Sequence, residues 1–527
     1  MFRREFIKAG AGATALIATP AFVPVPALGS HDTLTEFALS DPEIDPYGAD
    51  HNPSFVGSYD DADDREAFEA WLEDDTDTGR IVREYDHLDQ TAFTLSWSEA
   101  GVSQLWGGLE HRSGGLDDLT YLEFADANAI LDHPEPIEPD DLVSESAFSL
   151  ETGWLERQLL ALELGQLDAE PDIDGLAFDD DAPESTLREA RRLVGAGDGV
   201  LEDTNRGDGV TVIVIDTGIE DRSIYEDENG DRRIQPESTD FTSAGDPTVD
   251  ENGIDTVSDA DGHGDWVSAC ILADNDDDRY SGFAPEADLV TAKALDEDGG
   301  AVADIVAGVD LAIDVDADVI CMSLGSPQWS EALADALEDA WDAGAFTVVA
   351  SGNDRVGTTF TAHPASAEHG LPVNATNVPE SGDRDDTQIA NFGNVGPHPG
   401  TQDFSSGASE GAGPELAAPG MQIEIDPVGT LTGTSMAAPM VAGAAAVLAG
   451  EGHDNEAIHD RLLESAYPVE HFGVTESEYG LLDLEAALEG REHDDDQADV
   501  RSDSARTRDD FNEALSVSRG RLILRLF

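Results

Sequence analysis

The apolar stretch from Met436 to Leu448 restricts the fold of this chain most, because it has no polar face to present to water. It consists mainly of alanine, valine and methionine, a composition that favours a helix buried on all sides. Ser435, directly before it, would lie in the first helical turn, where backbone N–H groups are unpaired and the helix dipole is positive. A serine at such a place can attack a carbonyl group while the N–H groups receive the resulting oxyanion.

A serine nucleophile also needs a general base and an acid that orients the base, and candidates for both stand upstream. The run Val210–Ile215 is rich in β-branched residues, as a buried parallel strand requires, and Asp216 follows at its carboxyl end. Open α/β sheets place their chemistry at that end of the strands. His263 stands between two glycines, which allow other backbone to approach closely. We therefore interpret Asp216 as the orienting acid, His263 as the base and Ser435 as the nucleophile.

The order Asp216, His263, Ser435 along the chain is the order found in subtilisin. The motifs around these residues read Ile-Asp-Thr-Gly, Gly-His-Gly and Gly-Thr-Ser-Met-Ala-Ala-Pro. In these motifs the chain resembles the subtilases, the subtilisin-like serine proteases. The resemblance implies an α/β fold, namely a three-layer domain with a central, mostly parallel sheet, preceded by a small α+β prodomain-like region.

Two further segments carry the same resemblance. Phe346 to Ala350 reads as a strand that leads through Gly352 to Asn353, and the resemblance implies that Asn353 donates a hydrogen bond to the oxyanion. The backbone N–H of Ser435 would be the second donor. Another strand ends in Ser323-Leu324-Gly325, which by resemblance binds the substrate backbone together with Gly352.

Alternating strands and helices in this region favour a parallel sheet with right-handed crossovers. Strands are predicted at 210–215, 288–292, 318–322 and 346–350, and helices at 302–313, 330–342, 434–449, 455–465 and near 479–488. We assign residues 201–490 to the catalytic domain.

The rest of the chain divides by composition. Residues 1–29 match a twin-arginine signal peptide with Arg3-Arg4 ahead of an apolar segment. We expect an acidic linker at 30–78, a propeptide-like α+β region at 79–128, an acidic linker or extension at 129–200, with helical patches at 155–164 and 185–193, and a C-terminal tail at 491–527. Within 79–128 the pattern predicts strands at 80–85, 91–97 and 119–124 and a helix at 98–106. This order resembles the inhibitory propeptide of subtilases, and a retained N-terminal domain is the alternative.

Charge excludes some partners and suggests an environment. The chain has 114 acidic and 27 basic residues, of which only Lys8 and Lys293 are lysines, and its net charge is −87. Such an excess repels itself in dilute buffer and is screened at molar salt. Because the acidity runs through the motifs as well, we interpret it as adaptation to salt, similar to the halolysin-like secreted subtilases. Nucleic-acid binding is excluded on charge grounds, and beyond the signal no segment is apolar enough to span a membrane.

Several positions depart from the family pattern or leave alternatives open. Asp265 follows the Gly-His-Gly motif, and we expect a solvated carboxylate at a helix N-terminus, or an inward one that raises the pKa of His263. Cys270 and Cys321 could be bonded or free, since export permits a disulfide but both lie in elements expected to be buried. The acidic loops 255–261 and 274–278 could carry structural calcium, although solvated loops are the stronger interpretation, and no metal ligands are named.

Taken together, the sequence predicts a secreted, salt-adapted serine endopeptidase that cuts peptide bonds through an acyl-enzyme. Its partners would be protein or peptide substrates, it would act as a monomer, and its chemistry would need no cofactor. Alternatives are a binding protein on an inactive subtilase fold, a self-processing protease of narrow specificity, and an esterase that uses the same triad.

Overall fold

The computed structural model describes residues 54–59, 61–96 and 184–493, and short strand segments between 102 and 177. Within 184–493 it leaves out short stretches, which are 228–229, 243–256, 276, 297–298, 327–328, 356–359, 397, 399–401, 404–407, 410–412, 471 and 474. The expected signal peptide, the helical patch at 155–164 and the tail beyond 493 lie outside the described residues. Among the described residues, no helix combines the length and hydropathy needed to cross a bilayer.

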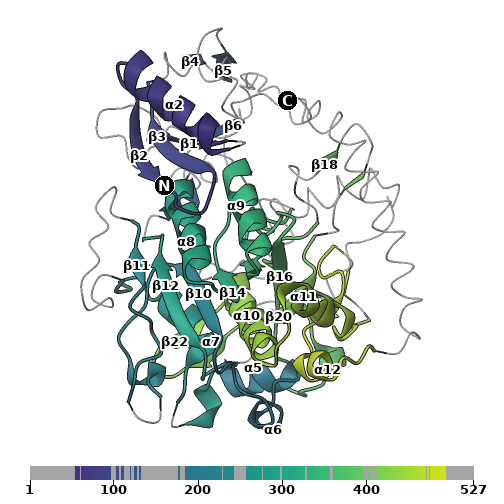
Figure 1. Cartoon of the computed structure of the whole chain (residues 1–527). Helices are drawn as coiled ribbons and strands as arrows, with labels where there is room; N and C mark the ends of the chain where they lie inside the picture. Colours follow the sequence, from purple (N-terminus) through teal and green to yellow (C-terminus); the bar gives the residue numbers. More distant parts are fainter. Residues whose placement is uncertain are drawn as a thin grey trace, which may run out of the picture.

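A ten-stranded, mostly parallel sheet forms the centre of the larger unit (Figure 1). Its strand order is β11 (Thr239–Asp240), β12 (Asp288–Lys293), β10 (Thr211–Asp216), β14 (Val319–Met322), β15 (Phe346–Ala350), β16 (Gly370–Thr376), β17 (Ile389–Ala390) and β8 (Leu176–Ala177), with β20 (Leu416–Pro419) on β16 and β23 (Gly480–Leu481) on β20. Neighbours are parallel except for β16 and β17. The expected α/β fold with a parallel central sheet is therefore confirmed.

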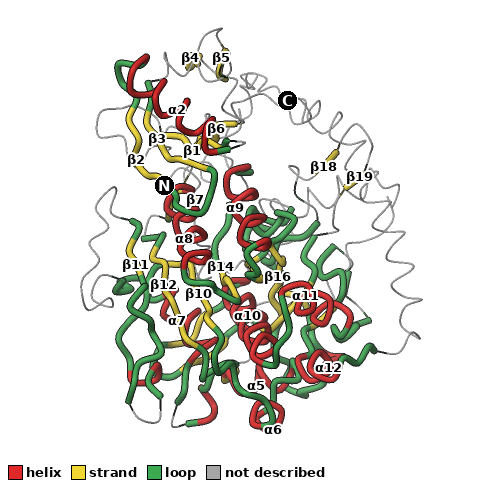
Figure 2. Tube along the Cα trace, viewed as in Figure 1, coloured by secondary structure: helices red, strands yellow, loops and turns green. Residues whose placement is uncertain are grey.

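Two helical layers cover the sheet, as the alternation of side chains along β10 requires (Figure 2). Val212 and Val214 belong to the apolar cluster that contains α7 (His263–Leu272) and α10 (Thr434–Gly450). Ile213 and Ile215 belong to the opposite cluster with α8 (Val302–Asp314) and α9 (Glu331–Asp342). The remaining helices of this unit are α5 (Leu187–Leu193), α6 (Asp198–Glu202), α11 (Asn455–Glu464) and α12 (Leu484–Glu489).

Helix α10 is the buried helix that its sequence predicts. Every residue from Thr434 to Leu448 is buried, and the helix packs against α7, β14, β15 and β16. Gly443 lets it approach the neighbouring chain closely, because a Cβ atom there would lie only 2.5 Å from the Cβ atom of Phe283.

The N-terminal unit is a four-stranded sheet with the order β2-β3-β1-β6, accompanied by α2. Its elements are β1 (Ser54–Ser58), α2 (Ala62–Asp75), β2 (Arg80–Glu84), β3 (Gln90–Thr94) and β6 (Phe124–Ala127), and β4 (Val102–Leu105) pairs with β5 (Gly108–His111) as a separate hairpin. The expectation of a linker at 30–78 is wrong where β1 and α2 lie. The short length of β1, five residues, hid it in the sequence. Acidic composition hid α2, which has four carboxylates among its first eight residues.

The helix expected at 98–106 is likewise wrong, because residues 102–105 form the strand β4. The helix of this unit precedes β2 instead, where Asp61 caps it by accepting hydrogen bonds from the N–H groups of Asp63 and Asp64. Strand pairing between distant segments decides which of these residues form strands, and a local sequence pattern cannot predict such pairing.

The N-terminal unit sits on helices α8 and α9 of the larger unit (Figure 1). The Tyr85 hydroxyl donates to the Ala303 carbonyl at 2.9 Å, and the Gln90 amide donates to the Ala332 carbonyl at 2.9 Å. Asp310 accepts hydrogen bonds from the N–H groups of Asp86 and His87. Farther along, β7 (Ile130–Leu131) pairs antiparallel with β13 (Gly300–Ala301), so the chain crosses onto the larger unit before residue 132.

Candidate active site

Asp216 and His263 form a buried pair at the carboxyl edge of the sheet. Asp216 ends β10 and His263 begins α7, and the two residues are 0% and 1% exposed. The Nδ1 atom of His263 lies 2.8 Å from Oδ1 of Asp216, which also accepts hydrogen bonds from the N–H group and the hydroxyl of Thr217. The other carboxylate oxygen, Oδ2, has no hydrogen-bond partner among the described residues. Thr217 thus fixes the Oδ1 atom of Asp216 in the position where it faces the imidazole of His263.

Side-chain oxygens hold the first turn of α7, where a helix leaves its N–H groups unpaired. Asp259 accepts hydrogen bonds from the N–H groups of Gly262, at 2.9 Å, and Asp265, at 2.8 Å. The N–H group of His263 donates to Asp261 at 3.2 Å, and that of Gly264 donates to the Thr217 hydroxyl at 2.9 Å. A Cβ atom on Gly264 would lie 2.4 Å from the carbonyl oxygen of Gly218, so only glycine fits beside the histidine.

The pKa of His263 results from opposing effects. Burial lowers it, but the charge and the hydrogen bond of Asp216, followed by the charges of Asp261 and Asp259, outweigh burial and raise the pKa above its ordinary value of 6.5. The imidazolium form is therefore stabilised in this site, which is what a base that must accept a proton requires.

Asp265 differs from its sequence prediction. Its carboxylate is 0% exposed, and it accepts hydrogen bonds from the Arg222 guanidinium at 2.6 Å and the Tyr225 hydroxyl at 2.8 Å. Burial nevertheless raises the pKa of Asp265, against these hydrogen bonds. The expectation of a solvated carboxylate is wrong, because Arg222, 43 residues earlier, supplies a partner that sequence spacing could not indicate.

Two hydrogen bonds join Ser435 and Ser323, each from the hydroxyl of one residue to the backbone carbonyl of the other. The Ser323 hydroxyl donates to the Ser435 carbonyl at 2.9 Å, and the Ser435 hydroxyl donates to the Ser323 carbonyl at 3.3 Å. The first contact has a cause in the sequence. Pro439 stands four residues after Ser435 inside α10 and has no N–H group, so the Ser435 carbonyl lacks its helical donor. The hydroxyl of Ser323 takes the place of that donor.

Asn353 presents an unused donor beside Ser435. Its Oδ1 atom accepts hydrogen bonds from the N–H group of Thr434 at 2.9 Å and from the Thr434 hydroxyl at 2.8 Å. Its Nδ2 atom is buried and has no hydrogen-bond partner among the described residues. A Cβ atom built on Gly433 would lie 3.0 Å from that Nδ2 atom and 3.7 Å from the Ser435 nitrogen. The missing side chain of Gly433 therefore leaves the Asn353 amide and the Ser435 N–H group facing the same point, as the two donors of an oxyanion site must.

The segment around Ala362 lies between the two segments expected to bind substrate, which end at Gly325 and Gly352. Ser326 exchanges two backbone hydrogen bonds with His363, and the N–H group of Ala362 donates to the carbonyl of Ser351. The Cβ atom of Ala362 lies 3.0 and 3.1 Å from the positions that Cβ atoms on Gly325 and Gly352 would take. Ala362 thus fills the space between the strand ends, whereas Leu324 is fully buried below them.

The structure therefore joins Ser323 to Ser435, Asn353 to the neighbouring Thr434, and Asp216 to His263. Helix α7, which begins at His263, packs on α10, which contains Ser435. Sequence reasoning quoted Thr434 only as part of its motif and missed its hydrogen bonds to Asn353. It missed Asn394 and Asp259 altogether, because neither of these residues stands in one of the quoted motifs. Cys270 and Cys321 are both buried and free, and burial raises the pKa of each thiol.

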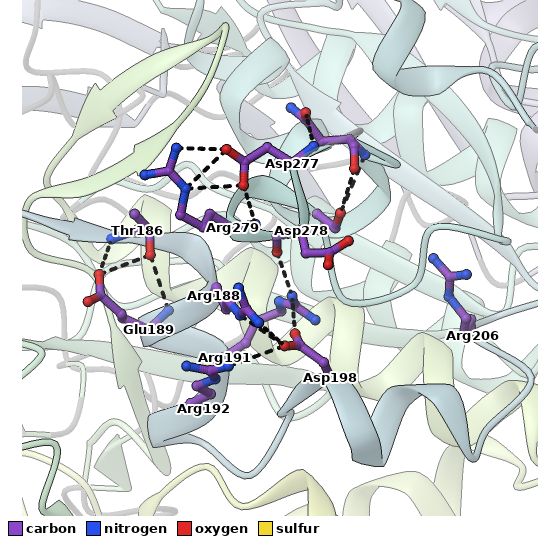
Figure 3. A network of polar contacts seen from close by, with 12 residues as sticks. Thr186, Arg188, Glu189, Arg191, Arg192, Asp198, Arg206, Asp277, Asp278 and Arg279 are labelled. Carbon is purple, nitrogen blue, oxygen red and sulfur yellow. Dashed lines mark hydrogen bonds and ion pairs between the residues drawn. The ribbon is translucent and has the colours of Figure 1, made fainter.

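Arginines occupy the loop where calcium was considered (Figure 3). Asp277 is paired with Arg279 at 2.7 Å, and Asp274 lies 3.6 Å from Arg206. Nearby, Asp198 forms ion pairs with Arg188, Arg191 and Arg192. In the other loop, Asp259 and Asp261 cap α7, and residues 255–256 lie outside the described part. No group of three or more side chains that could hold a metal ion occurs among the described residues.

Comparison with known proteins places this geometry in a family. Residues 207–494, more than half of the chain, match the model described as the Subtilase family. The thermophilic serine proteinase of Bacillus sp. (strain AK1) is 30% identical over 277 residues, which cover 51% of this chain and 60% of that protein. Subtilisin BL of Lederbergia lenta is 32% identical over 249 residues, 46% of this chain and 77% of that protein.

Two other similarities are to a second protease and to a solved structure. The halolysin-like extracellular serine protease Nep of Natrialba magadii is 30% identical over 301 residues, covering 55% of this chain and 49% of that protein. The solved structure of fervidolysin from Fervidobacterium pennivorans aligns with a TM-score of 0.57 at 20% identity, over 91% of this chain and 66% of that one. The match to fervidolysin supports the fold. The chain thus spans less than two thirds of the length of several of these proteins.

Proposed function

The chain belongs to the subtilase family, and from this premise we propose that it is a serine endopeptidase that hydrolyses peptide bonds through Asp216, His263 and Ser435. The observation that carries the proposal is the buried, unpaired Nδ2 atom of Asn353 beside the first turn of α10. A buried donor without a partner costs about 1–3 kcal/mol, so its retention next to a serine calls for a role in binding developing charge.

In the proposed reaction the Ser435 hydroxyl attacks the scissile carbonyl carbon while His263 takes the hydroxyl proton. The tetrahedral oxyanion accepts hydrogen bonds from Nδ2 of Asn353 and the N–H group of Ser435. The C–N bond breaks as His263 returns the proton to the leaving amine, and water then hydrolyses the acyl-enzyme with His263 as base. Asp216 keeps the imidazole oriented and stabilises its charged form. The backbone of Ser323, Leu324, Gly325 and Gly352 would align the substrate. These steps need no cofactor, since side chains and backbone carry them.

The test is the variant Ser435→Ala in the full chain at molar salt. It should lose peptide hydrolysis and labelling by a fluorophosphonate while its circular dichroism stays that of the wild type. A p-nitrophenyl ester assayed beside a peptide would identify an esterase. Cleavage of peptide by Ser435→Ala at the wild-type rate would refute the assignment.

We propose further that residues 54–131 act as an inhibitory prodomain. The support is the docking on α8 and α9 through Tyr85, Gln90 and Asp310, together with the β7–β13 pairing beside the segment that follows β12. The backbone of that segment lies against Asp216, whose carbonyl accepts the N–H groups of Ala294 and Leu295. A strand paired there lies close to the chain segment that contacts Asp216, so it would hinder the approach of a substrate.

Maturation tests this idea. Active enzyme should begin at a residue between about 130 and 205, where the acidic Asp-Asp-Asp-Ala-Pro stretch at 179–183 is a candidate for nicking. Ser435→Ala should accumulate as the longer chain. An active form whose N-terminal sequence starts near residue 30 would favour a retained domain.

We infer export through the twin-arginine route and activity at high salt. The Arg3-Arg4 pair with its apolar continuation and the net charge of −87 support these inferences. Replacing Arg3 and Arg4 by lysine should trap the chain inside the cell, as measured by fractionation, and unchanged export would exclude this route. The same charge supports action on protein or peptide substrates without nucleic-acid partners.

We propose that arginine replaces calcium in holding the loop 274–279. Asp277 already accepts three hydrogen bonds from the Arg279 side chain, and Asp198 binds three guanidinium groups (Figure 3). A chelator at fixed molar salt should leave the melting temperature unchanged. A chelator-induced fall that added Ca²⁺ reverses would contradict the proposal.

A further inference from the structure

We propose that Asn394 is a positioning residue for the oxyanion donor, because it clamps the two peptide groups on either side of Asn353. The inference rests on the proposed function and deepens it. No described contact joins Asn394 to Gly433 or Ser435, so its effect on catalysis runs through Asn353.

The clamp consists of two backbone contacts made by one residue. The N–H group of Asn394 donates to the carbonyl of Gly352 at 2.9 Å. The side-chain oxygen of Asn394 accepts the N–H group of Asp354 at 2.7 Å. These are the peptide groups directly before and after Asn353, so the Cα–Cβ direction of Asn353 is set from both sides.

Packing makes the clamp tight. Gly352 has a φ of +101°, and a Cβ atom there would lie 2.5 Å from the Asn394 side-chain nitrogen. The backbone of Gly352 therefore packs directly against the side-chain amide of Asn394. A side chain at position 352 would strain the backbone and displace Asn394. Asn394 itself is 2% exposed, so water does not compete for its contacts.

Asn394 is in turn held to the central sheet. The amide of Asn374, which is 0% exposed on β16, donates to the carbonyl of Asn394 at 3.3 Å and to the carbonyl of Glu476 at 2.9 Å. The side-chain oxygen of Asn374 accepts a hydrogen bond from the N–H group of Ala375 at 2.8 Å. The N–H group of Arg355 also donates to the carbonyl of Phe392 at 3.0 Å. The oxyanion loop is thus tied to β16 and not only to α10.

Two independent sets of contacts consequently orient Asn353. Thr434, at the start of α10, holds its Oδ1 atom, and Asn394 holds its backbone. Together they aim the remaining Nδ2 atom. An error of about 1 Å in such a group can cost about 10²-fold in rate. Loss of the side-chain contact should therefore lower kcat. KM should change little, because a substitution at position 394 keeps the backbone hydrogen bond to the substrate-binding Gly352, and no described contact joins Asn394 to the backbone of Ser323 to Gly325.

A double-mutant cycle in the full chain tests the inference. Asn353→Ala should lower kcat by about 10²–10³-fold. Asn394→Ala alone should lower kcat about 10-fold or more with KM within about 3-fold. In the Asn353→Ala background, Asn394→Ala should change kcat by less than about 3-fold, because there is no donor left to aim. Equal losses in both backgrounds, or no loss from Asn394→Ala, would overturn the inference.

Two controls separate positioning from folding. If Asn394→Ala does not fold, Asn394→Leu runs the same cycle, since it keeps the volume of the amide and removes the acceptor. Asn205→Ala removes a comparable amide at the other end of α10, where Asn205 donates to the Gly450 carbonyl at 2.6 Å, and should lower the melting temperature without changing kcat. A wild-type chain as inactive as Ser435→Ala would indicate failure of the proposed function. Loss of activity in both Ser435→Ala and Asn353→Ala, with full activity in Asn394→Ala, would instead overturn this inference alone.

Discussion

At the scale of single residues, the site depends on one buried carboxylate–imidazole pair. In the proposed mechanism peptide hydrolysis needs neutral His263, and the pKa of His263 is raised above 6.5 chiefly because Asp216 outweighs the effect of burial. A raised pKa means that the protonated, inactive form persists to higher pH. We therefore expect kcat/KM to be lost as pH falls through a value above 6.5. The pH profile of kcat/KM measures this, since it reports the free enzyme.

The variant Asp216→Asn supplies the control for this profile. It keeps the size of the side chain and removes its charge, so the midpoint of the acid limb should move down and kcat should fall about 10⁴-fold. A wild-type midpoint at or below 6.5, or an unchanged midpoint in the variant, would show that Asp216 does not set this pKa.

Gly433 gives a second prediction at this scale. A methyl group there would lie 3.0 Å from Nδ2 of Asn353, inside the volume that the oxyanion would occupy. The backbone of Gly433 is extended, so alanine fits it without strain. Gly433→Ala should therefore lower kcat by at least the 10²–10³-fold or so that a lost donor costs, with little change in melting temperature. Kinetics beside thermal unfolding measure both, and wild-type kcat in this variant would place the oxyanion elsewhere.

At the scale of elements, α10 contains a proline that a buried helix would ordinarily avoid. Pro439 leaves the Ser435 carbonyl without its helical donor, and Ser323 on the segment after β14 supplies the replacement. Ser323→Ala should leave this buried carbonyl unpaired and destabilise the fold by about 1–3 kcal/mol. Thermal unfolding at fixed salt, in the Ser435→Ala background to prevent self-digestion, measures the effect.

Adding Pro439→Ala provides a matched rescue. Alanine returns an N–H group four residues after position 435, so the double variant should regain most of the lost stability. Ser323→Ala with the stability of its parent would show that this carbonyl has another partner.

At the scale of the whole molecule, we expect the surplus negative charge to govern stability. Asp339 on α9 illustrates the crowding, because burial, then Asp89 of the N-terminal unit and two neighbours on α9, raise its pKa to about 6. Repulsion among 114 carboxylates reaches about 30 Å at 0.01 M salt but only about 3 Å at 1 M. Activity and ellipticity should therefore rise together from dilute buffer to molar NaCl or KCl. Full structure and activity at about 0.01 M salt would contradict this.

The sequence alone determined much of the larger unit. β10, β12, β14 and β15 and the helices α8 to α11 occur where the pattern predicts them, because runs of β-branched residues and apolar helical stripes are local signals. It failed at β1, α2 and β4, where acidic composition or short length hid elements that long-range pairing stabilises. The site residues stood out only where the chemistry lies in a motif.

Tertiary structure alone decided how these residues are supported. Asp265 is buried against Arg222, Ser323 replaces the donor missing at Pro439, and Asn394 holds the loop of Asn353. Each of these follows from a contact between residues at least 40 positions apart. A sequence records which groups can donate and accept hydrogen bonds. Which of them meet depends on how the sheet and its two helical layers bring distant segments together, and burial then makes each such meeting energetically decisive.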